Sequence, residues 1–107
     1  MQYTVFMLLE AEHDLEAIFR YILGTGNPGA AKDMIRLIRQ ACESLSQMPE
    51  RGYAPSELAG TDNYEYRQII VKPYRIIYQV VESIVFIFGI THGRRNVDEV
   101  LRRRLSM

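Results

Sequence analysis

Side chains that could move a proton or hold an anion gather in the last part of the sequence. His92 has an ordinary pKa of about 6.5, which suits proton transfer near neutral pH. Arg75 and Arg94 could clamp a phosphate, because a guanidinium offers paired donors that match two oxygens. The other candidates for contact with a target or a nucleic acid are Arg67, Arg95, Arg102 and Arg103.

The charges are divided unevenly along the chain. Residues 1–63 carry five Lys/Arg and nine Asp/Glu, a balance of −4, whereas residues 64–107 carry eight and four, a balance of +4. Such asymmetry favours a basic region that meets an acidic partner or nucleic acid. A scatter of solvated charges explains the same numbers equally well.

Each candidate also has a purely structural interpretation. Arg75 could pack its stem in a strand and pair locally, and His92 at a strand end is typical of a hydrogen-bonded or capping residue. Arginines at 102–104 suit the C-terminal end of a helix, and acidic residues suit a solvated helix start at Glu10, Glu12, Asp14 and Glu16. No residues have the spacing of metal ligands, so we expect neither a metal nor a cofactor. Cys42 stands among apolar helical positions and is expected to be a buried structural thiol.

Two helices are predicted in the first half of the chain. Ala11, Leu15, Ile18, Phe19 and Ile22 recur at spacings of three and four, as on one face of a helix. A second helix is predicted from Gly29 to Met48, with an apolar stripe of Met34, Leu37, Ile38, Ala41, Leu45 and Met48. The glycines at 24–29 suit a turn between the two helices, with Asn27 as the cap and Pro28 in the first turn.

Strand patterns dominate the rest. A first strand is predicted at Tyr3–Leu8, and three more at Tyr66–Val71, Tyr74–Val81 and Ile84–Thr91. Two-residue turns join these three, which makes them antiparallel hairpins. The last strand is apolar on both faces, so we expect it to be central and covered on both sides. A short basic helix is expected from Asn96 to Leu105.

This order of elements predicts an α+β fold. An N-terminal strand and a helical hairpin would pack on an antiparallel sheet, with a short helix at the C-terminus. The 107 residues fit one domain, 1–107. No apolar run is long enough to span a membrane, and the N-terminus lacks the pattern of a signal peptide, so a cytoplasmic location is expected.

Short sequence pieces in a fixed order resemble the RelE/ParE toxin superfamily, and within it the ParE-like plasmid-stabilisation toxins. The resemblance covers nearly the whole chain. The pieces are Tyr3-Thr4-Val5, Ala11 with Asp14-Leu15 and Ile18, Met48-Pro49 with Gly52, Glu57-Leu58, Tyr66-Arg67-Gln68-Ile69, Tyr74-Arg75-Ile76-Ile77-Tyr78-Gln79-Val80, and Ile90-Thr91-His92-Gly93-Arg94-Arg95.

The resemblance implies the toxin of a type II toxin–antitoxin system. A cognate, ParD-like antitoxin would neutralise the toxin, and their complex would bind promoter DNA. The ParE-like branch implies inhibition of DNA gyrase by direct binding, without chemistry of its own. The RelE-like alternative implies a metal-independent endoribonuclease that cleaves messenger RNA on the ribosome, with Arg75, His92 and Arg94 in the catalytic site.

Two departures favour the ParE-like interpretation. The RelE pattern usually has several lysines before the equivalent of Arg75, but residues 50–71 contain none. That branch also often uses a tyrosine near the C-terminus, and none follows Tyr78. A third hypothesis is a degenerate member that is not toxic but still binds an antitoxin.

Overall fold

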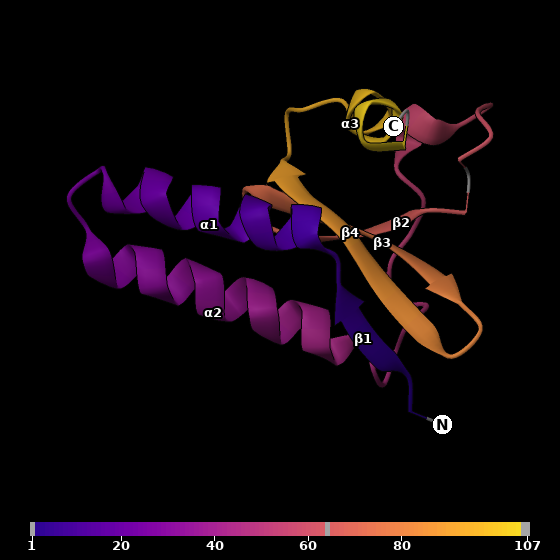
Figure 1. Cartoon of the computed structure of the whole chain (residues 1–107), viewed down its shortest axis with the longest axis horizontal. Helices are drawn as coiled ribbons and strands as arrows, with labels where there is room; N and C mark the ends of the chain where they lie inside the picture. Colours follow the sequence, from indigo (N-terminus) through magenta and orange to yellow (C-terminus); the bar gives the residue numbers. More distant parts are fainter. Residues whose placement is uncertain (1, 64, 106–107) are drawn as a thin grey trace.

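The computed structural model describes residues 2–63 and 65–105 (Figure 1). Its strands are β1 (Thr4–Met7), β2 (Arg67–Val71), β3 (Tyr74–Val81) and β4 (Ile84–His92). Its helices are α1 (Leu9–Leu23), α2 (Pro28–Ser44) and α3 (Val97–Leu105), with a 3-10 turn η1 (Ser56–Leu58). The element order is the predicted one, and the fold is α+β with a short C-terminal helix.

The four strands form one mixed sheet in the order β1-β4-β3-β2. The antiparallel pairing of β2, β3 and β4 confirms the two predicted hairpins. The predicted N-terminal strand joins this antiparallel sheet as a fourth strand, because β1 pairs with β4 in parallel. Parallel strands require a long crossover connection. Here everything from α1 to β3 lies between the two paired strands in the sequence.

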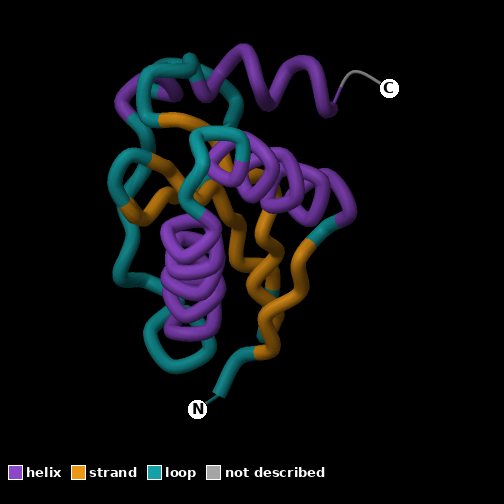
Figure 2. The backbone as a smooth tube through the Cα atoms, turned by 90° about the vertical axis from the view of Figure 1, so that its left-hand side faces the viewer, coloured by secondary structure: helices purple, strands orange, loops and turns teal. Residues whose placement is uncertain are grey.

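The helical hairpin covers one face of this sheet, and Figure 2 shows both helices on the same side of the strands. Asn27 caps α2 as predicted, because its side chain accepts a hydrogen bond from the backbone N–H of Ala30 at 3.0 Å. The main core lies between hairpin and sheet, and Cys42 is buried in it. Burial raises the pKa of that thiol to about 12, so Cys42 is a protonated core residue at neutral pH.

The predicted end of the second helix is wrong by four residues. The helix ends at Ser44, where the hydroxyl donates to the carbonyl of Ala41 at 2.6 Å and the following turns tighten. Side-chain bonds of this kind compete with the helical backbone pattern. Met48 lies beyond this end and is 60% exposed, so it is not part of the stripe. Leu37 lies within α2 but is 46% exposed, so its place in the buried stripe was also wrong.

A second, smaller core lies on the opposite face of the sheet. It joins η1, β3 and α3 through Leu58, Tyr66, Ile77, Val97 and Leu101, with Phe88 packed against it. Phe88 is the extra residue of a β-bulge, because Ile77 pairs with Gly89 while Tyr78 pairs with Ile87.

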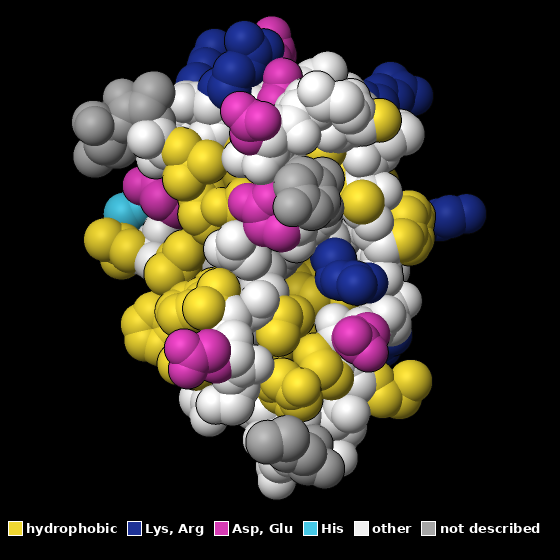
Figure 3. Space-filling view, turned by 90° about the vertical axis from the view of Figure 1, so that its right-hand side faces the viewer, with side chains coloured by type: hydrophobic (Ala, Val, Ile, Leu, Met, Phe, Trp, Pro, Cys, Tyr) yellow, Lys and Arg dark blue, Asp and Glu magenta, His cyan; other side chains and the backbone are white. Residues whose placement is uncertain are grey.

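The central position of β4 is confirmed, but its cover is incomplete. The face of the sheet opposite the helical hairpin is buried next to α3. Farther from α3 on the same face, Phe6 of β1 is 53% exposed and Val81 of β3 is 43% exposed. Figure 3 shows hydrophobic side chains gathered on this face below α3. The reason is length: α3 spans nine residues and covers only part of the sheet. Among the described residues, no helix is long and apolar enough to cross a membrane.

Candidate functional site

Arg75 and His92 lie where β4 ends beside the start of β3. In this register Tyr74 lies opposite His92, and Arg75 lies opposite Thr91. Successive side chains of a strand point to opposite faces. His92 therefore shares the face of the helical hairpin with Tyr74, and Arg75 points to the face covered by α3.

The guanidinium of Arg75 is held by protein groups on several sides. Its Nε and Nη2 donate to the carbonyl of Gly93 at 3.0 Å and 2.6 Å, and its Nη1 donates to Glu57 at 2.9 Å and to Gln68 at 3.3 Å. The Arg75 and Glu57 side chains are only 16% and 17% exposed. These bonds support the structural interpretation of Arg75, because a phosphate would have to displace some of them.

Glu57 links this arginine to the C-terminal helix. Its Oε2 accepts from the backbone N–H of Val97 at 3.2 Å, at the first residue of α3. Partial burial opposes ionisation, but hydrogen bonds from Arg75 and from the backbone N–H groups outweigh it and lower the pKa of Glu57. An ionised Glu57 thus fastens the start of α3 to the sheet.

The lowered pKa of Glu57 predicts acid sensitivity in the docking of α3. A carboxyl group with a depressed folded pKa adds stability that is present above its unfolded value, here 4.5, and is lost as pH falls through the folded value. We expect the melting temperature of the wild type to fall more steeply below pH 4.5 than that of Glu57→Gln. Parallel melting profiles in that range would contradict the role given to Glu57.

His92 caps the turn that follows β4. Its Nδ1 accepts from the backbone N–H of Arg94 at 3.1 Å, and its ring lies edge-on to Tyr74 at a centroid distance of 6.0 Å. The side chain is exposed. The structure therefore shows the capping arrangement that the sequence allowed, and it places His92 across the sheet from Arg75.

Arg67 has a structural contact as well. It is half-buried and donates to the carbonyl of Gly52 at 2.8 Å. The hydroxyl of Tyr78 binds the same loop, donating to the carbonyl of Pro49 at 2.7 Å and accepting from the N–H of Gly52 at 3.0 Å. Together these bonds fix the loop after α2 against β2 and β3.

The remaining candidates are exposed on the turn after β4 (Arg94 and Arg95) and on α3 (Arg102 and Arg103), and we call these four the basic corner. Arg102 pairs with Asp98 at 3.2 Å one helical turn away. Arg95 and Arg103 line a hollow of about 340 Å³ between α3 and the start of α1, together with Glu10, Val100 and Arg104. The structure thus brings together residues from two separate parts of the sequence, and their role in binding a target stays a prediction.

An ion pair between Asp14 and Arg104 was missed by the sequence analysis. The pair is bidentate, with both distances 2.8 Å, and both side chains are 15% exposed. Asp14 also accepts from the backbone N–H of Ile90 at 2.8 Å. The expectation of a solvated helix start is therefore wrong for Asp14. A signal existed, since Asp14 and Arg104 stand three residues after the buried Ala11 and Leu101.

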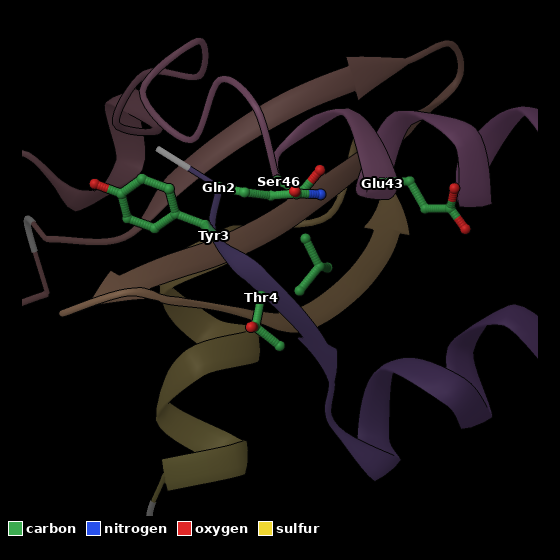
Figure 4. Close-up of a pocket in the computed structure, with 6 residues that line it drawn as sticks. Gln2, Tyr3, Thr4, Glu43 and Ser46 are labelled. Carbon is green, nitrogen blue, oxygen red and sulfur yellow. The ribbon is translucent and has the colours of Figure 1, made fainter.

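The hollow beside β1 offers no comparable grouping. It measures about 600 Å³ and is lined by Gln2, Tyr3, Thr4, Val5, Glu43 and Ser46. Figure 4 shows Tyr3 and Glu43 pointing away from one another, on opposite sides of the strand. The nearby polar contact is a backbone one, from the N–H of Tyr3 to the carbonyl of Ser46 at 2.8 Å. We therefore place the candidate site at the basic corner and not here.

Comparison with known proteins identifies the family of this chain. Residues 5–97 match the family described as the ParE toxin of the type II toxin–antitoxin system, parDE. This chain belongs to the ParE toxin family. It is a type II toxin–antitoxin toxin of the RelE/ParE superfamily. The chain is also 39% identical to the toxin RelE2 of Caulobacter vibrioides. The match extends over 82 residues, which are 77% of this chain and 85% of that relative.

Solved structures share the fold of this ParE-family chain. The chromosomal ParDE system of P. aeruginosa matches with a TM-score of 0.71 and 17% identity, over 85% of this chain and 96% of the other. The RelBE2 toxin–antitoxin complex of Mycobacterium tuberculosis matches with a TM-score of 0.58 and 21% identity, over 86% of this chain and 99% of the other. A mutant of the E. coli toxin RelE in its free state matches with a TM-score of 0.64 and 14% identity, over 99% of this chain and 97% of the other.

Proposed function

We propose that this toxin acts as ParE-like toxins do, by binding DNA gyrase, and that a cognate antitoxin neutralises it. The observation that carries the proposal is the state of Arg75. Its guanidinium is engaged by Glu57, Gln68 and the carbonyl of Gly93. In-line cleavage of RNA needs a base and a cation positioned at one phosphate. Arg75 and His92 lie on opposite faces of the sheet.

The basic corner is the proposed contact surface. Arg94, Arg95 and Arg103 are exposed there, and arginine is enriched where protein interfaces bind most tightly. Most of β4 is not part of this surface, because β4 lies inside the sheet. Only its C-terminal end, with His92, reaches the corner.

A cognate, ParD-like antitoxin is the proposed second partner. The matched structure from P. aeruginosa is described as a ParDE system, and that from M. tuberculosis as a toxin–antitoxin complex. We infer the same kind of assembly for this chain, with the complex bound to its promoter DNA. Partner binding would also raise the stability of a small domain by mass action.

A gyrase supercoiling assay tests the proposed target. We expect the purified protein to inhibit supercoiling, and the antitoxin encoded beside it to reverse the inhibition. Arg94→Ala/Arg95→Ala should weaken inhibition roughly tenfold or more, because central arginines often contribute above 1.4 kcal/mol to an interface. Its melting temperature should stay close to that of the wild type, since both side chains are exposed.

Two controls make this assay selective. Arg20→Ala/Arg51→Ala removes the same charge away from the basic corner and should leave inhibition unchanged. Arg75→Ala should lower the melting temperature, because it leaves Glu57 and the carbonyl of Gly93 without their partner. No inhibition by the wild type, even at a large excess over gyrase, would contradict the proposal.

The RelE-like endoribonuclease is the second candidate. The 39% identity to a relative named RelE2 favours it. It predicts that His92→Ala abolishes toxicity in cells without unfolding the protein. A fully toxic His92→Ala variant, together with ribosomes that leave messenger RNA intact, would contradict this alternative.

A further inference from the structure

The helical hairpin carries a groove between its two helices. It consists of two adjoining hollows of about 480 Å³ and 380 Å³, which share Phe19, Ile35 and Arg39. Leu15 and Ile35 also take part in the core between hairpin and sheet, so the groove follows the seam between α1 and α2, with core residues in its floor. Apolar side chains line its floor: Leu9, Leu15, Phe19 and Ile35.

The two rims of this groove carry opposite charges. The α1 rim has Glu12 and Glu16, which are four residues apart and exposed. The α2 rim has Lys32, Arg36 and Arg39, which recur at spacings of four and three along one face of the helix. The basic rim ends one turn after Arg39, where Glu43 follows.

The opposite charges of the two rims limit which molecules the groove can bind. A nucleic acid or a uniformly acidic peptide would meet repulsion along Glu12 and Glu16, and a uniformly basic one along the other rim. A well-matched occupant has an apolar stripe with one acidic and one basic flank. The same surface on another molecule of this chain has this composition.

A two-fold axis that runs parallel to the helices would match the charges residue by residue. The ion pair between Arg39 and Glu12, at 3.2 Å, shows that these two residues lie at the same height along the hairpin. One turn nearer its tip, Glu16 and Arg36 are again at a common height, since both helices rise by about 1.5 Å per residue. Such an axis preserves height and places the α1 of one copy over the α2 of the other.

We propose that this groove is a homodimer interface, in which two hairpins pack face to face as a four-helix arrangement. Glu12 and Glu16 of each copy then face Arg39 and Arg36 of the other, around the apolar floor. The ion pairs within one chain do not prevent this. Arg39 pairs with Glu12 across the groove, and both side chains are about half exposed. Glu16 pairs with Arg20, and Arg36 pairs with Asp33, and these four side chains are more than 60% exposed. Exposed pairs of this kind add little stability, so they can exchange for pairs across the interface.

Sedimentation equilibrium of the purified full chain tests the proposal. We expect a reversible monomer–dimer equilibrium in the micromolar range. Lys32→Glu/Arg36→Glu should weaken dimerisation roughly tenfold or more, because it makes both rims acidic. Glu12→Lys/Glu16→Lys should have the same effect, because it makes both rims basic.

Mixing the two variants gives the decisive measurement. The proposed axis places the lysines of one variant over the glutamates of the other on both sides of the interface. An equimolar mixture should therefore form a heterodimer, although each variant alone is largely monomeric. Arg94→Glu/Arg102→Glu changes the net charge as much as Lys32→Glu/Arg36→Glu does, but away from the groove, and it should dimerise like the wild type.

Three results would overturn the proposal. A wild type that stays monomeric at all concentrations would exclude the dimer. A dimer that both rim variants leave intact would use another surface. Rim variants that are monomeric and fail to associate when mixed would exclude the proposed axis. Melting temperatures of all variants check that each one is folded, so a loss of association is not mistaken for unfolding.

Discussion

We expect Gly52→Ala to lower the free energy of unfolding by about 3 kcal/mol, since a methyl group there overpacks a filled site. An added Cβ would lie 2.5 Å from the hydroxyl of Tyr78 and 2.6 Å from the backbone carbonyl of Gln68. The carbonyl belongs to β2 and has little room to move. Chemical denaturation with urea measures this loss.

Two further variants separate crowding from other effects at Gly52. Gly29→Ala is a matched control in α2, where the nearest atom to an added Cβ is 3.6 Å away. It should stabilise the protein by about 0.5–1 kcal/mol through the better helix propensity of alanine. Gly52→Ala/Tyr78→Phe should not recover wild-type stability, because the contact with Gln68 remains. If Gly52→Ala unfolded at the same urea concentration as the wild type, the loop would have moved to accommodate the methyl group, and the predicted crowding would be wrong.

The second large effect is expected for Asp14→Ala, which should cost about 3 kcal/mol. The change leaves Arg104 without its bidentate partner in a site where both side chains are 15% exposed. It also removes the acceptor for the backbone N–H of Ile90. Because Arg104 belongs to α3, the loss should appear first as release of that helix. Hydrogen exchange of the α3 amides measures this release.

A double-mutant cycle checks that the effect belongs to the pair. Arg104→Met keeps much of the side-chain volume and removes the charge. Asp14→Ala/Arg104→Met should be less destabilised than the sum of the single variants by about 1–3 kcal/mol. Asp33→Ala breaks the exposed pair with Arg36 and should cost under about 1 kcal/mol. If the losses in free energy of unfolding for Asp14→Ala and Arg104→Met simply added in the double variant, the two residues would not be coupled.

Gly89 shows how closely the sheet and α3 approach at this point. A Cβ there would collide with Nη1 of Arg104 and would lie 3.3 Å from Oδ2 of Asp14. The missing side chain leaves room for the guanidinium above β4, next to the bulge at Phe88. Glycine within a strand often marks a close approach of this kind.

The family resemblance rests on residues whose physical roles appear only in the folded chain. Gly52 and Tyr78 are 26 residues apart and hydrogen-bonded to each other. Glu57 and Arg75 are 18 apart and form one ion pair. In the sequence, Arg75 suggested a phosphate clamp, whereas the other three residues stood out only as parts of the resemblance. Their contacts instead explain how the loop after α2 and the start of α3 attach to the sheet.

The sequence by itself determined the elements and their order. Spacings of three and four placed Ala11, Leu15 and Ile18 on a buried helix face, and Asn27 with Pro28 marked the start of α2. The two-residue turns gave the antiparallel hairpins. These features depend on neighbours a few residues apart, so local pattern is enough to predict them.

Only the tertiary structure decided how distant segments meet. The parallel pairing of β1 with β4, the pair of Asp14 with Arg104 and the bond from Arg75 to Gly93 depend on the path of the whole chain. The same holds for the separation of Arg75 and His92 onto opposite faces, which follows from a register set across two strands. Side-chain chemistry indicates which residues could pair, but the packing of the two cores decides which of these residues come within hydrogen-bond distance.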